Sequence, residues 1–467
     1  MPADNYDAVI VGAGPAGLAA ALELGRAGAT VALVDEAPEL GGQFFRRRSA
    51  AVAAQHGDYR PAGSRLIADV RAAGVHCLTD TLVWGVEDGT LWTSRTDTGT
   101  VASIQGRATL LAPGAFERSV PFPGWTLPGV CTPGCALHFA TLDRIKVGDR
   151  VVIAGSGPFL LPVAVALLEL GTSVVGLFEL GTPYRPSIRA LRSTAHPARV
   201  RELASYLLVL RRHGVKIRQG SRVVAAHGRE RVETVTVASI NRPNPPVLEE
   251  LAVDALCVGY GFRPSVELAR LMGCECSADA ATGDLLPVTD GFGRTSKSDV
   301  FVAGEVMGIA GVQAALNRGR LAAYGMLVQL GQTPPATRVA LARWRARRLD
   351  AFARLTAELF PIPAWLYKAI PDDTLVCRCE SVAAGELRSA AGLGWNDLQA
   401  TKGFTRAGMG PCQGRECGNT VASLVADASG SPGGPGAFPA RMPLKPIPYP
   451  RLSGNEPPEP SSVGRAE

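Results

Sequence analysis

Near its beginning the chain reads Asp7-Ala8-Val9-Ile10-Val11-Gly12-Ala13-Gly14-Pro15-Ala16-Gly17, a short apolar strand that runs directly into a glycine-rich turn. The alanine- and leucine-rich residues 18–27 predict a helix after the turn, and residues 30–34 predict a second apolar strand. Gly12 permits the tight turn, Gly14 lets a pyrophosphate approach the backbone, and Gly17 lets the helix pack closely on the sheet. This context favours a dinucleotide-binding parallel sheet over the alternative, a glycine-rich loop in another parallel-sheet fold.

Two acidic residues follow the second predicted strand, at the position where an adenosine ribose is bound in such folds. Asp35 ends the second strand, at about the twenty-residue spacing of such sites, and Glu36 beside it is the second choice for this role. The helix N-terminus attracts the diphosphate, and a glycine turn at residues 41–43 returns the chain toward the nucleotide. The residues that we expect at this first site are Gly12, Gly14, Pro15, Ala16, Gly17, Asp35, Glu36, Gly42, Gln43 and, from the turn after the apolar residues 108–112, Gly114.

The same pattern recurs in the middle of the chain. Residues 151–154 predict a strand, Gly155-Ser156-Gly157-Pro158 a turn, residues 159–171 a helix, and residues 173–178 a strand that ends at Glu179. Leu160 replaces the third glycine, and it should push the helix away from the sheet and narrow the pyrophosphate site. A second Rossmann-like unit is therefore predicted, with Gly155, Gly157 and Glu179 as candidate cofactor residues, while nucleotide binding by this unit is left open.

A late segment is expected to rejoin the first unit. One apolar strand is predicted at residues 251–260 and another at residues 300–302, followed by Gly304, Glu305 and a helix at residues 312–330. This order is typical of flavoproteins with two dinucleotide-binding domains, where the acid, usually Asp, hydrogen-bonds the flavin ribityl chain. A plain strand–helix turn is the alternative.

The composition is that of a soluble globular protein. A chain of 467 residues with 46% hydrophobic and 19% charged residues suggests about two to four domains. The net charge of +6 is small, and the basic runs at residues 46–48 and 343–348 are read as solvated faces rather than nucleic-acid patches. The acidic, polar start does not read as a signal peptide, and no run reaches the about eighteen apolar residues of a membrane span. We expect a cytoplasmic protein that reaches a membrane only through partners.

The ten cysteines are read as metal ligands, redox groups or buried thiols rather than as a disulfide framework. Two local pairs stand out, Cys377-Arg378-Cys379 and Cys412-Gln413-Gly414-Arg415-Glu416-Cys417. Four thiolates gathered by a small helical segment suit an iron–sulfur cluster or a zinc ion. Because C-x-C combined with C-x-x-x-x-C is not a usual zinc-ribbon spacing, the iron–sulfur cluster is preferred.

The other cysteines carry weaker signals. Cys131 and Cys135 could form a redox dithiol, but three residues separate them where oxidoreductases have two. Cys77 and Cys257 lie in predicted strands, and Cys274-x-Cys276 has no second pair nearby. The simplest interpretation of all these thiols is structural.

Four stretches together resemble one family. They are residues 9–17, residues 41–43, the phrase Glu117-Arg118-x-x-Pro121-Phe122-Pro123-Gly124-Trp125-Thr126-Leu127-Pro128-Gly129-Val130, and residues 405–415. They are similar to the larger subunits of opine oxidase, hydrogen cyanide synthase and D-hydroxyproline dehydrogenase. The cysteine module resembles the bacterioferritin-associated-ferredoxin type of 2Fe–2S domain. The resemblance extends to about Leu424.

The resemblance implies an α/β fold with two interleaved Rossmann-like dinucleotide-binding domains, as in two-dinucleotide-binding-domain flavoproteins, and a small helical 2Fe–2S domain. We expect an FAD-binding domain at residues 1–118 and 286–335, interrupted by the second Rossmann-like domain at residues 119–285. The remaining segments are a helical linker at residues 336–370, the 2Fe–2S domain at residues 371–430 and a proline-rich tail at residues 431–467.

The resemblance also implies cofactors. FAD, or an adenine nucleotide alone, belongs at the first site, and some related complexes place a further flavin, such as FMN, at a subunit interface. The cluster ligands would be Cys377, Cys379, Cys412 and Cys417. Three departures from the family pattern bear on flavin contact and on the second site: Pro113 where many relatives have Thr, Glu305 for Asp, and Leu160 for Gly.

The implied function is that of an FAD-dependent oxidoreductase subunit. It would transfer electrons within a hetero-oligomeric dehydrogenase of opine-, glycine- or hydroxyproline-like substrates, beside a D-amino-acid-oxidase-like partner and in some cases a small ferredoxin-like subunit. No Ser/His/Asp or paired-carboxylate constellation is evident, so no catalytic residue is assigned; cofactors would carry the chemistry. The alternatives are a self-standing NAD(P)H-dependent flavoprotein reductase and a nucleotide-bound scaffold that senses redox state or iron.

Overall fold

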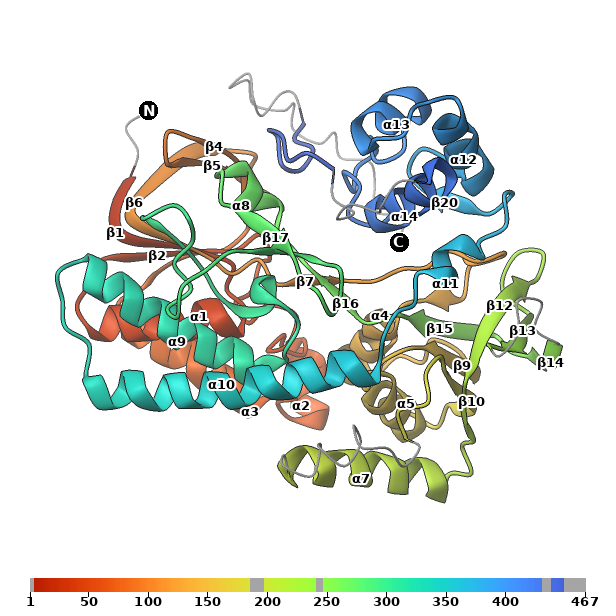
Figure 1. Cartoon of the computed structure of the whole chain (residues 1–467). Helices are drawn as coiled ribbons and strands as arrows, with labels where there is room; N and C mark the ends of the chain where they lie inside the picture. The colour runs from red at the N-terminus through yellow and green to blue at the C-terminus, as the bar shows by residue number, and fades with distance from the viewer. Residues whose placement is uncertain (1–3, 185–196, 241–246, 431–437, 449–467) are drawn as a thin grey trace, which may run out of the picture.

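The computed structural model describes residues 4–184, 197–240, 247–430 and 438–448. It is a mixed α/β fold in which two Rossmann-like units lie side by side and a small cysteine domain lies against the connection between them (Figure 1). The predicted fold class is confirmed. In the described part of the chain, no helix combines the length and apolar character that crossing a membrane requires.

The first unit is built on a seven-stranded sheet: six strands follow the order β3-β2-β1-β6-β5-β4, and the seventh, β19, pairs with β6. Strand β1 pairs in parallel with both β2 and β6, so Ile10 lies between Leu33 and Leu110. The pairing of β19 with β6 brings the late strand back to this sheet, as the sequence predicts. The strands are β1 Asp4–Val11, β2 Val31–Val34, β3 His76–Leu78, β4 Thr81–Glu87, β5 Thr90–Arg95, β6 Val101–Leu111 and β19 Val300–Val302.

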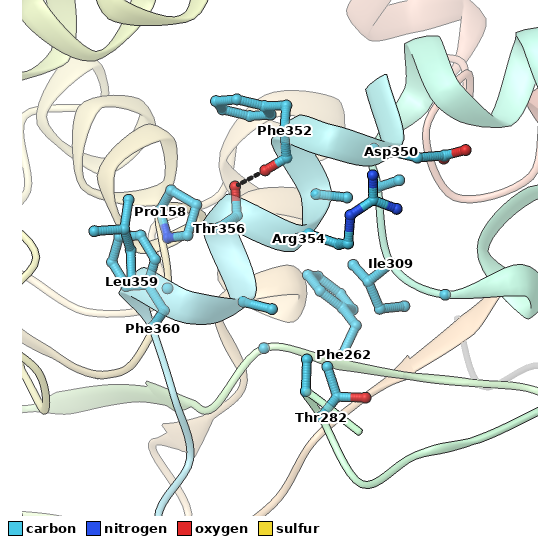
Figure 2. A pocket seen from close by; sticks show the side chains of 18 of the residues that line it. Pro158, Phe262, Thr282, Ile309, Asp350, Phe352, Arg354, Thr356, Leu359 and Phe360 are labelled. Carbon is cyan, nitrogen blue, oxygen red and sulfur yellow. Dashed lines mark hydrogen bonds between the residues drawn. The ribbon is translucent and has the colours of Figure 1, made fainter. Parts of the chain in front are cut away.

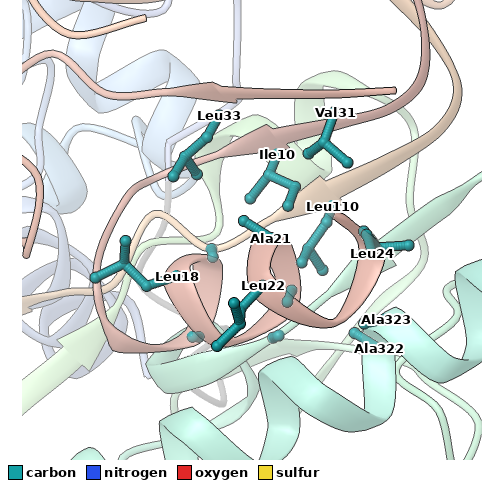
Figure 3. Packing of buried hydrophobic residues seen from close by; sticks show 14 of the residues in the cluster. Ile10, Leu18, Ala21, Leu22, Leu24, Val31, Leu33, Leu110, Ala322 and Ala323 are labelled. Atoms are coloured by element: carbon teal, nitrogen blue, oxygen red, sulfur yellow. The ribbon is translucent and has the colours of Figure 1, made fainter. Parts of the chain in front are cut away.

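Small side chains let the helices of this unit approach one another closely. A β-carbon at Gly17 would collide with the Gly12 carbonyl, and one at Gly319 would collide with the backbone of Ala16. Helix α1 is therefore held between the sheet and α9, and Figure 3 shows its leucines filling that space. The helices are α1 Pro15–Arg26, α2 Ala50–His56, α3 Pro61–Ala72, α9 Val312–Gln329 and α10 Ala336–Leu359, with the short 3-10 helix η3 Gly304–Met307 before α9.

The second unit has a five-stranded sheet of order β11-β10-β9-β15-β8, with a three-stranded sheet, β12-β13-β14, beside it. The prediction of a single strand at residues 251–260 is wrong. This segment contains the end of β14 and the whole of β15, and the two strands belong to different sheets. The chain bends between them, where Asp254 accepts hydrogen bonds from the backbone of Asp149 and Arg150. The strands are β8 Val130–Cys131, β9 Arg150–Gly155, β10 Ser173–Glu179, β11 Ile217–Gln219, β12 Ser221–His227, β13 Thr234–Ser239, β14 Val247–Ala252 and β15 Ala255–Gly259.

A narrow antiparallel ribbon joins the two units. It consists of β7 Ala115–Glu117 and β16 Phe262–Pro264. The helices of the second unit are α4 Pro133–His138, the π-helix η1 Phe139–Asp143, α5 Leu160–Glu169 and α7 Pro197–Arg212. After the ribbon, α8 Glu267–Leu271 packs on the first sheet, and β17 Cys276–Ala278 pairs with β18 Leu285–Pro287.

The cysteine domain has its own core and also contacts the rest of the molecule. Leu387, Val421 and Leu424 are fully buried, and the same cluster includes Tyr260 after β15 and Val120 after the ribbon. The elements are α11 Trp365–Lys368, β20 Leu375–Cys377, β21 Val382–Ala383, α12 Ala384–Gly392, α13 Leu398–Thr405 and α14 Gly418–Ser429. The shared core fixes this domain over the connection between the two units.

Candidate functional site

The first glycine loop has an open face. Gly12 adopts φ +104°, and a β-carbon there would strike the carbonyl of Ala112, so only glycine fits. A β-carbon at Gly14, in contrast, would meet no atom within 4 Å. Helix α1 begins at Pro15 directly after this open position. The loop therefore offers free space at the N-terminus of a helix, where a pyrophosphate is favoured.

Asp35 and Glu36 differ in their surroundings. The Asp35 carboxylate accepts hydrogen bonds from the backbone N–H of Ala13 at 2.6 Å and of Ala37 at 2.9 Å, and burial raises its pKa. It therefore ties the end of β2 to the glycine loop. The Glu36 side chain is 53% exposed and forms an ion pair with Lys445, which lies far away in the sequence.

Other predicted residues of the first site gather around this loop. Gly41 donates to the Ala13 carbonyl at 2.9 Å, and Gly42 packs against Gly14, so the turn at residues 41–43 does return to the loop. Gln43 in that turn is exposed. Gly114 lies just before β7, with open space at its α-carbon.

The return segment also reaches the loop. Gly304 lies against the Ala16 side chain, because a β-carbon at Gly304 would be 2.9 Å from it. Glu305 accepts hydrogen bonds from Ala310 N–H at 3.1 Å and Gly311 N–H at 2.8 Å, and burial raises its pKa. Its carboxylate thus stabilises the turn that leads into α9.

The second glycine loop differs in where its helix starts. Helix α5 begins at Leu160, three residues after Gly157, whereas α1 begins directly after Gly14. The leucine is only 2% exposed and is accommodated by this later start, and a β-carbon at Gly157 would meet no atom within 4 Å. The narrowing that we expected from Leu160 is therefore not seen at Gly157.

Glu179 occupies in this loop the place that Asp35 has in the first. It accepts hydrogen bonds from Gly157 N–H and Gly181 N–H, both at 3.2 Å. Burial raises the pKa of this carboxyl group to about 7. A β-carbon at Gly155 would collide with the Gly259 carbonyl, so the turn is as tight as the one at Gly12.

The second loop opens into a cavity of about 1460 Å³. Pro158 and Phe262 lie on its walls, together with Phe352 and Thr356 of the C-terminal half of α10 and with Phe360 just after that helix (Figure 2). The expected linker at residues 336–370 thus lines a cavity, which sequence reasoning missed, because its arginine-rich helix shows no ligand pattern. None of the first-site glycines Gly12, Gly14, Gly42 and Gly114 lines this cavity.

A buried ion-pair network borders the same cavity and also was not predicted. Arg118 Nη2 donates to both oxygens of Asp284, at 2.8 and 2.7 Å, and both side chains are at most 7% exposed. Arg263 on β16 adds a third charge, with its Nε 3.4 Å from Asp284. The network ties the ribbon to the loop before β18.

The four cysteines of the cysteine domain come together as two pairs. Cys377 ends β20 and interacts with Cys417, while Cys379 interacts with Cys412. The Cys417 thiol and backbone N–H groups, among them that of Gly408 at 3.5 Å, lower the pKa of Cys377 to about 6. The hydrogen bond to Cys377 and burial raise the pKa of Cys417, so the pairing favours Cys377 as the thiolate, the form that binds metal.

The two thiol pairs suit a binuclear cluster. A 2Fe–2S cluster uses two protein ligands on each iron, so two thiol pairs match its donor set. Gly410 packs directly on Cys379, which leaves no room for a side chain at position 410.

The cysteine loop, residues 408–417, lies on the connection between the units. The Arg415 guanidinium lies over the ring of Phe116 in β7, and Ser119 donates to Glu416 at 3.1 Å. Trp125 Nε1 donates to the Leu375 carbonyl at 2.8 Å. The cysteine site is therefore adjacent to the strand that follows Gly114.

The remaining thiols are distributed through the fold. Cys131 and Cys257 are register partners on β8 and β15, with their sulfur atoms 3.6 Å apart. Cys135 on α4 interacts with Cys131 and is exposed. Cys274 is buried, and Cys77 and Cys276 are partly buried.

Comparison with known proteins supports both parts of this architecture. Residues 6–322 match the pyridine nucleotide-disulphide oxidoreductase family, and residues 375–427 match the BFD-like [2Fe-2S] binding domain. An opine oxidase subunit of Agrobacterium tumefaciens is 34% identical over 95% of this chain and 90% of the relative. Hydrogen cyanide synthase subunit HcnB of Pseudomonas protegens is 32% identical over 95% of this chain and 97% of the relative.

Among solved structures, L-proline dehydrogenase from P. horikoshii superposes on this chain with a TM-score of 0.69. The alignment covers 97% of this chain and 80% of the dehydrogenase chain. Its sequence identity of 22% supports the fold alone. The family resemblance predicted from the sequence is confirmed. The chain belongs to the pyridine nucleotide-disulphide oxidoreductase family, as a flavin-dependent oxidoreductase with a C-terminal BFD-like 2Fe–2S domain.

Proposed function

We propose that this chain is the electron-transfer subunit of a hetero-oligomeric amine or amino-acid dehydrogenase. A partner flavoprotein of the D-amino-acid-oxidase type would oxidise a C–N bond of an opine-, glycine- or hydroxyproline-like substrate. This chain would then pass the electrons to an acceptor. The observation that carries the proposal is the position of the cysteine loop on β7, next to Gly114 of the first dinucleotide site.

The chain's own residues would hold two groups close together. The open face at Gly14 and the carboxylate of Asp35 suit FAD or its ADP portion, and Cys377, Cys379, Cys412 and Cys417 supply four thiol donors. When bound, a flavin and a 2Fe–2S cluster supply the electron-carrying chemistry. Strand β7 connects the two sites and, at about 3.3 Å per residue, spans only about 10 Å.

The relatives named above support a multi-subunit arrangement, because they are named as subunits of an oxidase and a synthase. A substrate pocket against a flavin belongs, in this proposal, to the partner. Partner contacts of a permanent complex should be large and apolar at their centre. The opine class is carried by the name of a relative, and the glycine- and hydroxyproline-like classes rest on the family resemblance seen in the sequence.

The test compares the chain alone with the complex purified from its native host. The chain, loaded with flavin and cluster, is assayed with a panel of amino acids, imino acids and opines and an artificial dye as acceptor. We expect no amine oxidation by the chain alone and turnover with the complex. Equal turnover by the chain alone would show that it has its own substrate site and would refute the proposal.

One observation favours a second candidate, a self-standing NAD(P)H-dependent reductase. The second glycine loop opens into the 1460 Å³ cavity, with Glu179 in the place of a ribose-binding acid. If this site binds NAD(P)H, mixing the flavin-loaded chain with NADH under anaerobic conditions should bleach the flavin absorbance rapidly. Unchanged absorbance over minutes would reject this candidate and leave the first in place.

A further inference from the structure

The last described segment, residues 438–448, returns from the cysteine domain to the first unit, and we name it the tail strap. At its start, the ring of Phe438 lies directly on Gly408 and Gly414 of the cysteine loop, where any β-carbon would collide with it. Phe438 is 7% exposed. Its carbonyl accepts a hydrogen bond from Arg270 of α8 at 2.6 Å, so the strap begins by joining the cysteine loop to the first unit.

The middle of the strap adds to the edge of the first sheet. Leu444 N–H donates to the Trp84 carbonyl at 2.6 Å, and Val86 N–H lies 3.2 Å from the Met442 sulfur. The Leu444 carbonyl in turn accepts from Arg415 Nη2 at 3.2 Å. Arg415 also donates to the Cys412 carbonyl at 3.3 Å, so one side chain bridges the strap and a cysteine ligand position.

The strap ends beside the first dinucleotide site. The Lys445 ammonium group forms an ion pair with Glu36, the neighbour of Asp35. Burial is the main cause that raises the pKa of Asp35; Glu36 raises it further by like-charge repulsion, and Lys445 lowers it. Two carboxylates and one ammonium group thus meet where the ribose of an adenosine is expected.

We propose that Lys445 is a positioning residue of the first dinucleotide site, acting through Glu36, and that the strap couples occupation of this site to the seating of the cysteine loop. The proposal rests on the proposed function, because it assumes that the first site binds an adenine nucleotide. Lys445 holds Glu36 to one side and neutralises it, so Asp35 remains the acceptor for ribose hydroxyl groups. The chemical class of ligand is an adenine nucleotide with free ribose hydroxyls, since the net charge there is negative and disfavours a 2′-phosphate.

The coupling follows from reciprocity. If the nucleotide binds more tightly when Lys445 is seated on Glu36, then the nucleotide must stabilise the seated strap by the same free energy. The strap contacts Gly408, Gly414 and Arg415, so its seating also orders the cysteine loop. Nucleotide binding should therefore be detectable at residues 408–415, although they belong to another domain.

The experiment measures ADP affinity by calorimetry on the full chain with its cluster, after bound flavin and nucleotide have been removed from the first site. Lys445→Ala should weaken ADP binding by up to about fivefold, the upper end for a partly exposed ion pair. Lys445→Arg should bind ADP as the wild type does. Glu36→Gln combined with Lys445→Ala should restore the affinity, because no charge is then left to neutralise. Arg441→Ala, an exposed position of the same strap, is the matched control and should have no effect.

Hydrogen exchange provides the second measurement. ADP should slow exchange at residues 408–415 and 438–448 in the wild type and much less in Lys445→Ala. The proposal is overturned if wild-type protein binds ADP but Lys445→Ala binds it equally well, or if the double variant is as weak as Lys445→Ala. Absence of adenine-nucleotide binding by the wild type would instead overturn the assignment of the first site itself. A preference for 2′,5′-ADP over ADP would contradict the ligand class.

Discussion

Arg415 of the cysteine loop lies over the ring of Phe116, with its guanidinium carbon 5.8 Å from the ring centroid. Phe116 is the central residue of β7, which follows Gly114 of the proposed first dinucleotide site and enters the connection between the units. The contact therefore joins the two predicted cofactor sites through one short strand. Because the same arginine also contacts the Cys412 carbonyl, it holds the cysteine loop against that strand.

The four paired cysteines should bind one 2Fe–2S cluster. Anaerobically prepared protein should contain about two irons and two acid-labile sulfides per chain. Cys412→Ser should lose most of both, because it removes a ligand from one thiol pair. Cys274→Ser, a buried thiol outside the cysteine domain, is the control and should retain them. Stoichiometric zinc without labile sulfide would contradict the prediction.

Gly14→Val should empty the first dinucleotide site without unfolding the protein. A β-carbon at Gly14 meets no protein atom, so the fold has room for the new side chain, which then fills the space of the pyrophosphate. Nucleotide content after purification is the measurement, with the melting temperature as a check on folding. Gly392→Val, at an exposed glycine that also faces open space, is the control. Full nucleotide content in Gly14→Val would refute the assignment.

Glu179 should make stability depend on pH near neutrality. Burial raises the pKa of its carboxyl group from 4.5 to about 7, so folding favours the protonated form. The stabilisation is complete below pH 4.5 and is lost as the pH rises through 7. Between pH 5 and pH 8, Glu179→Gln should gain up to about 3 kcal/mol in unfolding free energy relative to the wild type.

Urea unfolding of the two proteins at both pH values measures this difference. If the unfolding free energies of the two proteins differ by the same amount at both pH values, Glu179 is ionised in the folded protein from pH 5 to pH 8, and the prediction is wrong. Glu202→Gln, at an exposed helix position, serves as the control for a simple loss of charge.

Asp284→Ala should be strongly destabilising. It leaves Arg118, which is 7% exposed, without its carboxylate, and removes the same partner from Arg263. Removing one partner of a buried ion pair lowers the free energy of unfolding by about 3–5 kcal/mol. Asp149→Ala, which removes an exposed pair with Lys146, should change the melting temperature little. Equal melting temperatures for the two variants would contradict the prediction.

Local patterns allowed most of the fold to be predicted. The strand–glycine–helix units at Gly12 and Gly155, and the late strand at residues 300–302, were found because hydrophobic periodicity and glycine spacing are local signals. The break at Asp254 was missed, because the apolar run continues on both sides and only hydrogen bonds to β9 show that two sheets meet there.

The site residues show the same limit. The gathering of Gly14, Gly42 and Gly304 follows from sheet topology, which the repeated pattern predicts. The ion pair of Lys445 with Glu36 and the lining of the cavity by α10 depend on how distant segments pack, and a lysine in a proline-rich tail has no distinguishing local pattern. Leu160 was interpreted as an obstacle because the later start of α5 is a tertiary adjustment.

The pairing of β19 with β6 has a consequence for biosynthesis. The first sheet and the contact of α1 with α9 require residues 300–329, whereas the strands of the inserted sheet all precede residue 260. During synthesis on the ribosome, all strands of the second unit are therefore made before the first unit, which begins the chain, receives its last strand. Until α9 emerges, the apolar face of α1 lacks its cover, and we expect that nascent chains shorter than about 330 residues attract chaperones through this helix.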